Sequence, residues 1–383
     1  MKIVIAPDSF KESLSALDVC QAVEAGLQKA FPQATYIHLP IGDGGEGTVQ
    51  SVVDATNGSI IPIKVKGPLG TNVDAFYGLT GEGKTAIIEM AAASGLHLVP
   101  RDERNPLITS TYGTGQLIKN ALDQGVERIV LGLGGSATND GGAGMVQALG
   151  AKLVDQNNEE LSPGGQALSE LASIDVSNLD PRLKTVQIEA ACDVTNPLTG
   201  SSGASAIFGP QKGANPAMAD ELDRSLAHYA KVIEKDLGKA VTHISGAGAA
   251  GGLGAGIVAF LKGELRSGIN LVLDVIQFED CISGADLLLT GEGRIDSQTV
   301  HGKAPVGVAK RGKALNAALP VIAIAGSLGD GYETVFDHGI DAVFSVMNGV
   351  MTLEEALENG AVNMEKTLEN IGRLVKVSRM IEM

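Results

Sequence analysis

The sequence predicts an α/β protein in which a second α/β domain is inserted into a discontinuous parallel-sheet domain. Short apolar runs alternate with helix-like segments at both ends of the chain, whereas the middle has Gly-rich turns and a hairpin-like stretch. The 383 residues are also many for one compact core and suit two domains. We expect residues 1–60 and 285–383 to form the first domain and residues 61–284 the inserted one.

The first sixty residues predict two strand–helix units. Buried strands are expected at KIVIAPD and TYIHLPI, and helical spacing follows in SALDVCQAVEAGLQKAF and in EGTVQSVVDATNG. The last hundred residues repeat this order, with apolar runs at DLLLTG, VIAIAG and AVFSV and with helices between and after them. Strands alternating with helices imply a parallel sheet covered on both faces, and such sheets bind ligands at the carboxyl ends of their strands.

The stretch GLTGEGKT, residues 78–85, matches the phosphate-loop pattern G-x-x-x-x-G-K-[ST]. A phosphate loop needs a strand before it and a helix after it. Here NVDAFYGL precedes the glycines and TAIIEM follows them, and both segments have the composition of strands. We therefore predict a β-hairpin at this place in preference to a nucleotide site.

Composition argues against several classes of protein. Lys and Arg total 29 and Asp and Glu total 45, a formal net charge of −16 that disfavours nucleic-acid and anionic-membrane partners. No apolar run is long enough to cross a bilayer, and Pro7 and Asp8 end the N-terminal apolar stretch too early for a signal peptide, so we expect a cytoplasmic protein. The wide spacing of Cys20, Cys192 and Cys281 suggests neither a disulfide framework nor a zinc site.

Polar groups gather where the predicted strands of the outer domain end. The first strand is followed by Asp8, Ser9 and Lys11, and the second by Asp43. The loop after the third strand contains Gly291, Glu292, Gly293, Asp296, Gln298, Thr299 and Lys303. Carboxylates can hold Mg²⁺, and cations and backbone amides can bind phosphate, so these loops fit phosphoryl transfer. For the first loop, a helix N-cap followed by a surface lysine is the alternative.

The predicted inserted domain adds further polar loops. In residues 129–151 a strand, IVLGLGG, leads through SATNDGG into a helix, and the helix N-terminus could hold an anion near Ser136, Asn139 and Asp140. A capped helix with a tight glycine turn explains this stretch equally well. The other candidates are Asp193 and Asn196 in ACDVTNPL and Lys212 in GPQKGA.

The stretch SGAGAAGGLGAG contains the dinucleotide pattern G-x-G-x-x-G at Gly246, Gly248 and Gly251. The preceding VTHIS is short for a first strand, and the glycines continue past the pattern. We predict close helix packing or a substrate-facing turn, with a NAD-dependent hydroxyacid dehydrogenase as the alternative function.

Nine ordered blocks together resemble the type I glycerate kinases of bacterial glycolate, glucarate and galactarate breakdown. They are PDSFKESLSA, DGGEGT, EMAAASGL, TSTYGTGQLI, GGSATNDGGAGMVQALGA, CDVTNPLTG, FGPQKGA, GAGAAGGLGAG and TGEGRIDSQTVHGK. The resemblance implies a Rossmann- or flavodoxin-like domain with an inserted α/β domain, and ATP- and Mg²⁺-dependent phosphorylation of D-glycerate to 2-phospho-D-glycerate. One departure is Gly42, where the family more often has Ala.

We assign roles to the loop residues as hypotheses. Asp193, Lys11 and Asp8 are expected to be catalytic, with Asp193 as the general base. Glycerate is assigned to Ser136, Asn139, Asp140, Asn196 and Lys212. ATP is assigned to Ser9, Gly291, Glu292, Gly293, Gln298, Thr299 and Lys303, and Mg²⁺ to Asp43 and Asp296, beside Asp8 and Glu292. Phosphorylation of the 3-hydroxyl and a non-catalytic sugar-acid sensor stay open, as does a homodimer.

Overall fold

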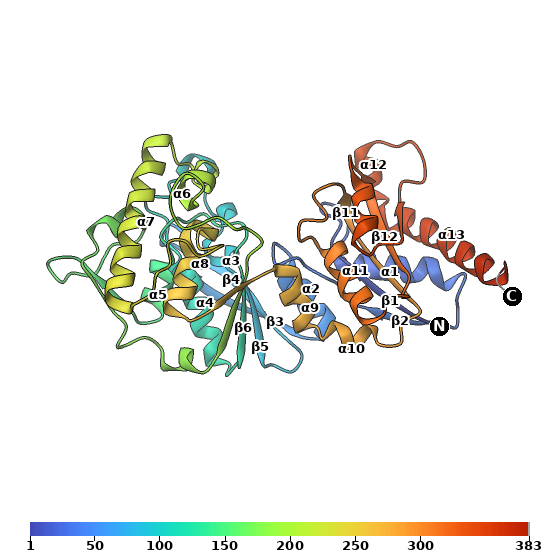
Figure 1. Ribbon diagram of the computed structural model, residues 1–383, viewed down its shortest axis with the longest axis horizontal. Coiled ribbons are helices and arrows are strands. Elements are labelled where there is room, and N and C mark those ends of the chain that lie inside the picture. Colours follow the sequence, from blue (N-terminus) through green and yellow to red (C-terminus); the bar gives the residue numbers. More distant parts are fainter. Residues whose placement is uncertain (382–383) are drawn as a thin grey trace. The chain divides into compact units, whose positions relative to one another are not determined.

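In the computed structural model residues 1–381 are described, and the chain divides into two compact units (Figure 1). Unit 1 comprises Met1–Asp43, Gln50–Asn57 and the chain from Val272 onward, and unit 2 comprises Gly44–Val49 and Gly58–Leu271. Compared with the predicted domains, residues 272–284 belong to unit 1, and residues 44–49 and 58–60 belong to unit 2.

Unit 1 is built on a parallel sheet with the strand order β13-β12-β11-β1-β2 in the described residues. Its strands are β1 (Lys2–Pro7), β2 (Thr35–His38), β11 (Leu287–Ile295), β12 (Val321–Leu328) and β13 (Ala342–Ser345). Counted within the unit, this order is 2-1-3-4-5, the flavodoxin-like arrangement. The direction in which strands are added reverses between β1 and β11, where open α/β sheets bind their ligands.

Helices cover both faces of this sheet, as the alternation of strands and helices predicted. Alternate strand residues such as Ile3 and Leu289 pack with α1 (Ala16–Gln28) and α13 (Gly360–Ile381) in one apolar core. Helix α11 (Ala304–Leu315) contacts β1, β11 and β12. The other helices with residues in unit 1 are α2 (Thr48–Thr56), α9 (Gly268–Val275), α10 (Phe278–Ile282), α12 (Leu353–Glu358) and the 3-10 helix Tyr332–His338.

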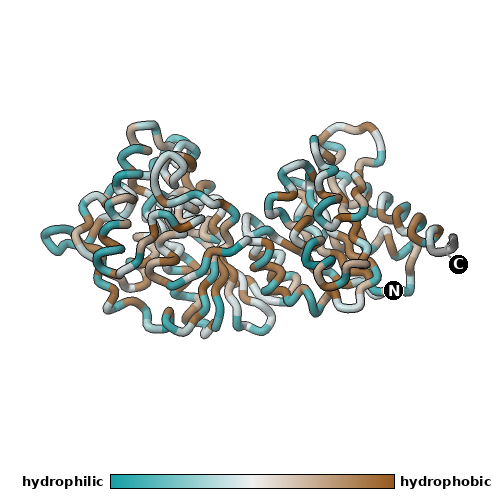
Figure 2. The backbone as a smooth tube through the Cα atoms, in the orientation of Figure 1, coloured by the Kyte–Doolittle hydropathy of each residue, from teal (hydrophilic) through white to brown (hydrophobic). Residues whose placement is uncertain are grey.

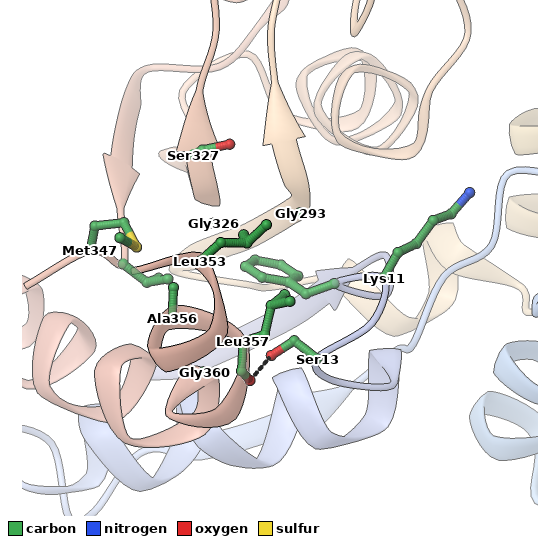
Figure 3. A pocket seen from close by; sticks show the side chains of 12 residues that line it. Lys11, Ser13, Gly293, Gly326, Ser327, Met347, Leu353, Ala356, Leu357 and Gly360 are labelled. Atoms are coloured by element: carbon green, nitrogen blue, oxygen red, sulfur yellow. Dashed lines mark hydrogen bonds between the residues drawn. The ribbon is translucent and has the colours of Figure 1, made fainter. Parts of the chain in front are cut away.

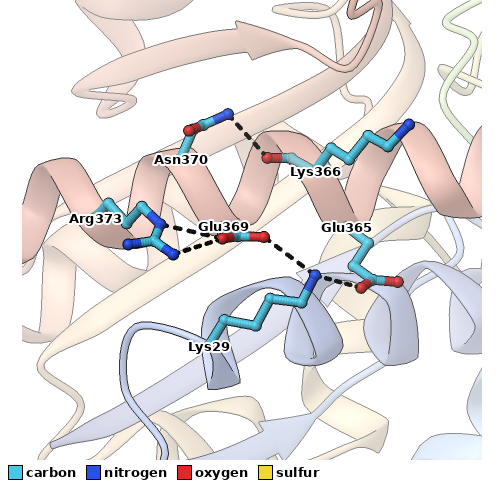
Figure 4. Close-up of polar contacts among 6 residues, drawn as sticks. All are labelled: Lys29, Glu365, Lys366, Glu369, Asn370 and Arg373. Atoms are coloured by element: carbon cyan, nitrogen blue, oxygen red, sulfur yellow. Dashed lines mark hydrogen bonds and ion pairs between the residues drawn. The ribbon is translucent and has the colours of Figure 1, made fainter.

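The contact between α1 and α13 depends on a glycine. A Cβ on Gly26 would lie 2.8 Å from Cβ of Leu368, so only glycine allows the two helices to approach this closely. Ion pairs border the contact: Lys29 Nζ lies 2.6 Å from Glu365 and 3.1 Å from Glu369, and Glu369 also pairs with Arg373 (Figure 4). These pairs lie at the surface, where solvent screens them and they stabilise the protein little, so apolar burial provides most of the stabilisation.

Unit 2 has a mixed sheet with the strand order β10-β9-β6-β5-β4-β3 in the described residues. Its strands are β3 (Ser59–Lys66), β4 (Asn72–Leu79), β5 (Thr85–Glu89), β6 (Arg128–Gly132), β9 (Gln187–Ala191) and β10 (Glu264–Arg266), and β7 (Lys152–Val154) pairs separately with β8 (Ser173–Asp175). Strands β4 and β5 are antiparallel, and Thr80 N donates to Thr85 O at 3.0 Å. The predicted hairpin at GLTGEGKT is therefore confirmed.

Helices surround the second sheet and complete a separate apolar core. They are α3 (Ala91–Ser94), α4 (Tyr112–Asp123), α5 (Ala143–Ala148), α6 (Ala204–Phe208), α7 (Pro216–Leu237) and α8 (Ala249–Phe260), with 3-10 helices at Leu96–Leu98, Arg101–Glu103, Gln166–Glu170, Pro181–Lys184 and Pro210–Lys212. Hydrophobic stretches follow the central strands of each unit in Figure 2. Within residues 1–381 no helix is long and apolar enough to cross a membrane.

The glycine-rich stretch after residue 245 serves close packing. Residues 241–248 contain turns and no strand, so the setting of a dinucleotide fingerprint is missing from this described segment. Gly251 adopts φ +69°, and a Cβ there would lie 2.6 Å from Cα of Asn139. The first turn of α8 therefore packs directly on the loop that follows β6.

Candidate active site

A cluster of carboxylates lies at the switch point of the unit 1 sheet. Asp8 directly follows β1, and its backbone N–H donates to the carbonyl oxygen of Gly291 in β11 at 2.8 Å. Burial, together with the negative charges of Asp43 and Glu292, raises the pKa of Asp8 to about 7, while hydrogen bonding from Ser9, whose N–H donates to the carboxylate at 2.6 Å, opposes the rise. Asp8, predicted to be catalytic, is thus brought together with Asp43, predicted to bind Mg²⁺, and with Glu292, predicted to bind ATP, and the three acids repel one another.

Glu292 connects this cluster to the loop after β11. Glu292 is 8% exposed as a residue, one of its carboxylate oxygens accepts from Thr299 Oγ1 at 2.6 Å, and the other lies 3.2 Å from Lys303 Nζ. Burial raises the pKa of Glu292, while Thr299 and Lys303 oppose the rise. Asp296 accepts from Gln298 N at 2.9 Å and pairs with Arg294 at 3.2 Å.

Carboxylate oxygens, which this cluster supplies, are ligands suited to Mg²⁺. Among the described residues no three His, Cys, Asp or Glu side chains are grouped as a ready-made metal cage. Mg²⁺ is commonly held by one or two carboxylates together with substrate phosphates, so a full cage is not required. The repulsion that raises the pKa of Asp8 is what a bound cation would relieve.

The loop between β6 and α5 in unit 2 is organised around a buried carboxylate. Asp140 is fully buried and accepts from Thr111 N at 2.8 Å, from Thr111 Oγ1 at 2.9 Å, and from the backbone N–H groups of Gly142 and Gly144 at 3.1 and 3.2 Å. Burial raises the pKa of Asp140, and these donors oppose the rise. The geometry fixes the start of α5 by hydrogen bonding.

Lys212 and Asn139 also lie inside unit 2. Lys212 is 1% exposed and donates to the carbonyl oxygen of Thr138 at 2.7 Å, and burial lowers its pKa to about 7 although Asp140 opposes the change. Asn139 donates to Ser205 Oγ at 2.9 Å. Its Oδ1 is buried with no hydrogen-bond partner among the described residues.

Three more predicted residues, two for glycerate and one for the general base, follow β6 and β9 of unit 2. Asp193 follows β9, is exposed, and accepts from Gly268 N at 3.1 Å. Asn196 donates to the carbonyl oxygen of Ser202 at 2.8 Å, and Ser136 is 7% exposed in the loop after β6. Strands β6 and β9 are parallel neighbours, so Ser136 and Asp193 belong to adjacent strand ends on the same sheet edge.

Sequence reasoning missed Glu89 at this edge. It is the last residue of β5, and its carboxylate accepts from Val49 N at 2.9 Å in the segment Gly44–Val49, which belongs to the same unit. Burial raises the pKa of Glu89. The available signal was an acid that directly ends the apolar run TAII.

Comparisons with known proteins agree along nearly the whole chain. Residues 3–376 match the model of the Glycerate kinase family. A glycerate kinase of Bacillus subtilis (strain 168) is 58% identical over 99% of both chains, and the glycerate 2-kinase of Escherichia coli (strain K12) is 55% identical over 98% of both. The crystal structure of a proposed glycerate kinase 2 from Salmonella typhimurium LT2 superimposes with a TM-score of 0.92, at 55% identity, and the match covers 99% of each chain. The chain belongs to the glycerate kinase family.

Proposed function

We propose that this kinase transfers the terminal phosphoryl group of ATP to the 2-hydroxyl of D-glycerate, in the cytoplasm and as a step of organic acid catabolism. The observation that supports ATP as donor is the cluster of Asp8, Glu292 and Lys303 at the switch point of a flavodoxin-like sheet. The name of the E. coli relative, glycerate 2-kinase, supports the 2-hydroxyl as acceptor.

The unit 1 loops are assigned to the nucleotide. Lys11 and Lys303 neutralise phosphate oxygens, and the loop containing Gln298 and Thr299 supports the phosphate chain. Asp8, Asp43, Glu292 and Asp296 are the carboxylates that would hold Mg²⁺. When bound, the ion would neutralise charge on the transferring phosphate.

The unit 2 loops are assigned to glycerate. Ser136 and Asn196 are proposed to contact the acid, because they lie at strand ends on the ligand-binding edge. Asp140, Asn139 and Lys212 are buried, and we assign them to holding the loop after β6 in the conformation that binds glycerate.

Asp193 is assigned as the general base. It is exposed, and one backbone N–H holds one of its oxygens at 3.1 Å. In the proposed step the hydroxyl proton of glycerate passes to Asp193, the hydroxyl oxygen forms a bond to the terminal phosphorus, and the bond from that phosphorus to ADP breaks.

An assay coupled to ADP release tests this function. We expect ADP to form when D-glycerate is added to the protein with MgATP, and to stop forming when EDTA is in excess. L-Glycerate serves as the matched control for the acceptor. A rate of ADP release that does not depend on D-glycerate, or that is unchanged without divalent metal, would contradict the proposal.

A further inference from the structure

A pocket of about 180 Å³ opens within unit 1 beside the switch point (Figure 3). Its walls come from β11 and β12, from the chain that follows β1 and β13, and from α12. Its main side-chain walls are apolar, contributed by Phe10, Met347, Leu353, Ala356 and Leu357. None of these five residues was assigned a role in the reaction, whereas Lys11, which also lines the pocket, was assigned to phosphate.

The pocket suits a flat apolar ring better than a small hydroxy acid. Phe10 supplies an aromatic wall, and Gly293 and Gly326 line the sheet side without adding a side chain. D-Glycerate is an anion of three carbons with two hydroxyls, and an apolar wall would leave its polar groups without partners.

The pocket shares one residue with the groups assigned to phosphate. Lys11 lines it, and a Cβ on Gly293, which also lines it, would lie 3.7 Å from Lys11 N. The Lys11 side chain extends away from the other labelled side chains in Figure 3. A ligand with its ring in the pocket would therefore have its anionic part near Lys11.

The wall formed by Met347 and α12 is exposed to water, and hydrogen bonds hold α12 in place. Met347 and Leu353 are 38% and 74% exposed, so two apolar side chains of the wall face water. Ser13 Oγ donates to the carbonyl oxygen of Leu357 at 2.7 Å, which ties α12 to the loop after β1, and Thr352 caps α12 with a capping box. The pocket is thus preformed, and a bound ring would remove apolar surface from water.

We propose that this pocket binds the base of the nucleotide donor. The proposal rests on ATP being the donor of the reaction. It divides unit 1 into a base subsite lined by Phe10, Gly326, Met347, Leu353 and Ala356, and a phosphate subsite at the switch point.

Two variants test the base subsite by isothermal titration calorimetry with MgATP and with magnesium tripolyphosphate, which lacks the base. Leu353→Ala removes part of an exposed wall and should weaken MgATP binding about tenfold. Ala356→Phe fills the pocket and should weaken it at least tenfold. Neither variant should change tripolyphosphate binding by more than about twofold. Leu374→Ala, an exposed leucine on α13 outside the pocket, is the matched control and should change neither.

The outcomes separate this proposal from the proposed function. Wild-type MgATP affinity in a folded Leu353→Ala variant that still phosphorylates glycerate would place the base elsewhere and leave the kinase intact. Equal weakening of MgATP and tripolyphosphate would also contradict a base subsite. A wild-type protein that neither binds MgATP nor transfers its phosphate would overturn both. If Ala356→Phe fails to fold by circular dichroism, Leu353→Ala alone decides.

Discussion

Two aspartates that follow parallel strands have opposite surroundings. Asp8 is half-buried and is crowded by Asp43 and Glu292, so its negative charge is unfavourable. Asp193 is exposed, and a backbone N–H holds its carboxylate oxygen. These surroundings fit a metal- or phosphate-linked role for Asp8 and proton acceptance for Asp193.

Asp193→Asn tests the general base. The amide cannot take up the hydroxyl proton, so kcat should fall at least ~10²-fold while the melting temperature changes little. Steady-state kinetics and thermal unfolding measure both quantities. The same exchange at the exposed Asp102 controls for loss of a negative charge and should leave kcat unchanged. An unaltered kcat in Asp193→Asn would remove this residue from the role.

The pH dependence of stability tests the crowding around Asp8. Its pKa is about 7 in the folded protein against an ordinary value of 3.8, so between these values the folded state keeps a proton that the unfolded chain loses. The free energy of unfolding should therefore fall as pH rises through this window, by at most about 1.4 kcal/mol per pH unit for this one group. Asp8→Asn has no carboxyl group to ionise at this position, so its free energy of unfolding should not show this loss.

With EDTA present, Asp8→Asn should accordingly gain stability over the wild type, and the gain should be larger at pH 8 than at pH 5. Chemical denaturation at the two pH values measures the difference. A gain of the same size at both would mean that the folded protein does not perturb this carboxyl group.

At the scale of elements, the loop between β6 and α5 is held from several sides. Asp140 ties it to Thr111, Lys212 binds the carbonyl of Thr138, and Gly251 lets α8 pack against it. The conformation of the loop therefore depends on segments that are distant in the sequence. A change in any of these segments should alter the loop after β6, which we assign to glycerate.

Gly251→Ala tests this packing. Gly251 and Gly284 have nearly the same backbone angle, φ +69° and +70°, but a Cβ at 284 would meet nothing within 4 Å. Gly284→Ala should cost about 1–2 kcal/mol of the free energy of unfolding from the backbone angle alone. Gly251→Ala should cost about 1–3 kcal/mol more through overpacking, and should also raise KM for glycerate.

Urea denaturation and glycerate kinetics of the two variants provide the comparison. Equal costs in the two proteins, with unchanged KM, would show that the contact between α8 and the loop after β6 has no energetic weight.

Local pattern predicted the elements whose periodicity is strong. The two strand–helix units at the N-terminus, the hairpin at residues 72–89 and α11 follow from apolar spacing and turn residues. The burial of Lys212 and Asp140 could not be predicted, because it arises from contacts with Thr138 and Thr111 that are 74 and 29 residues away in sequence. Glu89 was missed for the same reason, since its role depends on a segment forty residues earlier.

In the molecule as a whole, two apolar cores of the described residues are assembled from the chain in different ways. The first uses residues from both ends of the chain, such as Ile5 and Leu368, and the second lies wholly between Val65 and Leu261. A core that is continuous in sequence and has its own sheet should be able to fold by itself.

A fragment of residues 58–271 tests this independence. It contains the whole second core and the sheet from β3 to β10, so we expect a cooperative thermal transition and a circular dichroism spectrum of a mixed α/β protein. A fragment that unfolds without cooperativity would mean that unit 2 depends on the rest of the chain.

The function that we propose for this chain is phosphorylation of D-glycerate at the 2-hydroxyl, with MgATP as the donor. The most direct measurement is ³¹P NMR of the purified protein with MgATP and D-glycerate, with authentic phosphoglycerates as markers. We predict a 2-phosphoglycerate resonance that grows as the terminal phosphate signal of ATP declines. A 3-phosphoglycerate resonance would contradict the assigned hydroxyl, and ATP that stays intact would contradict the assigned donor.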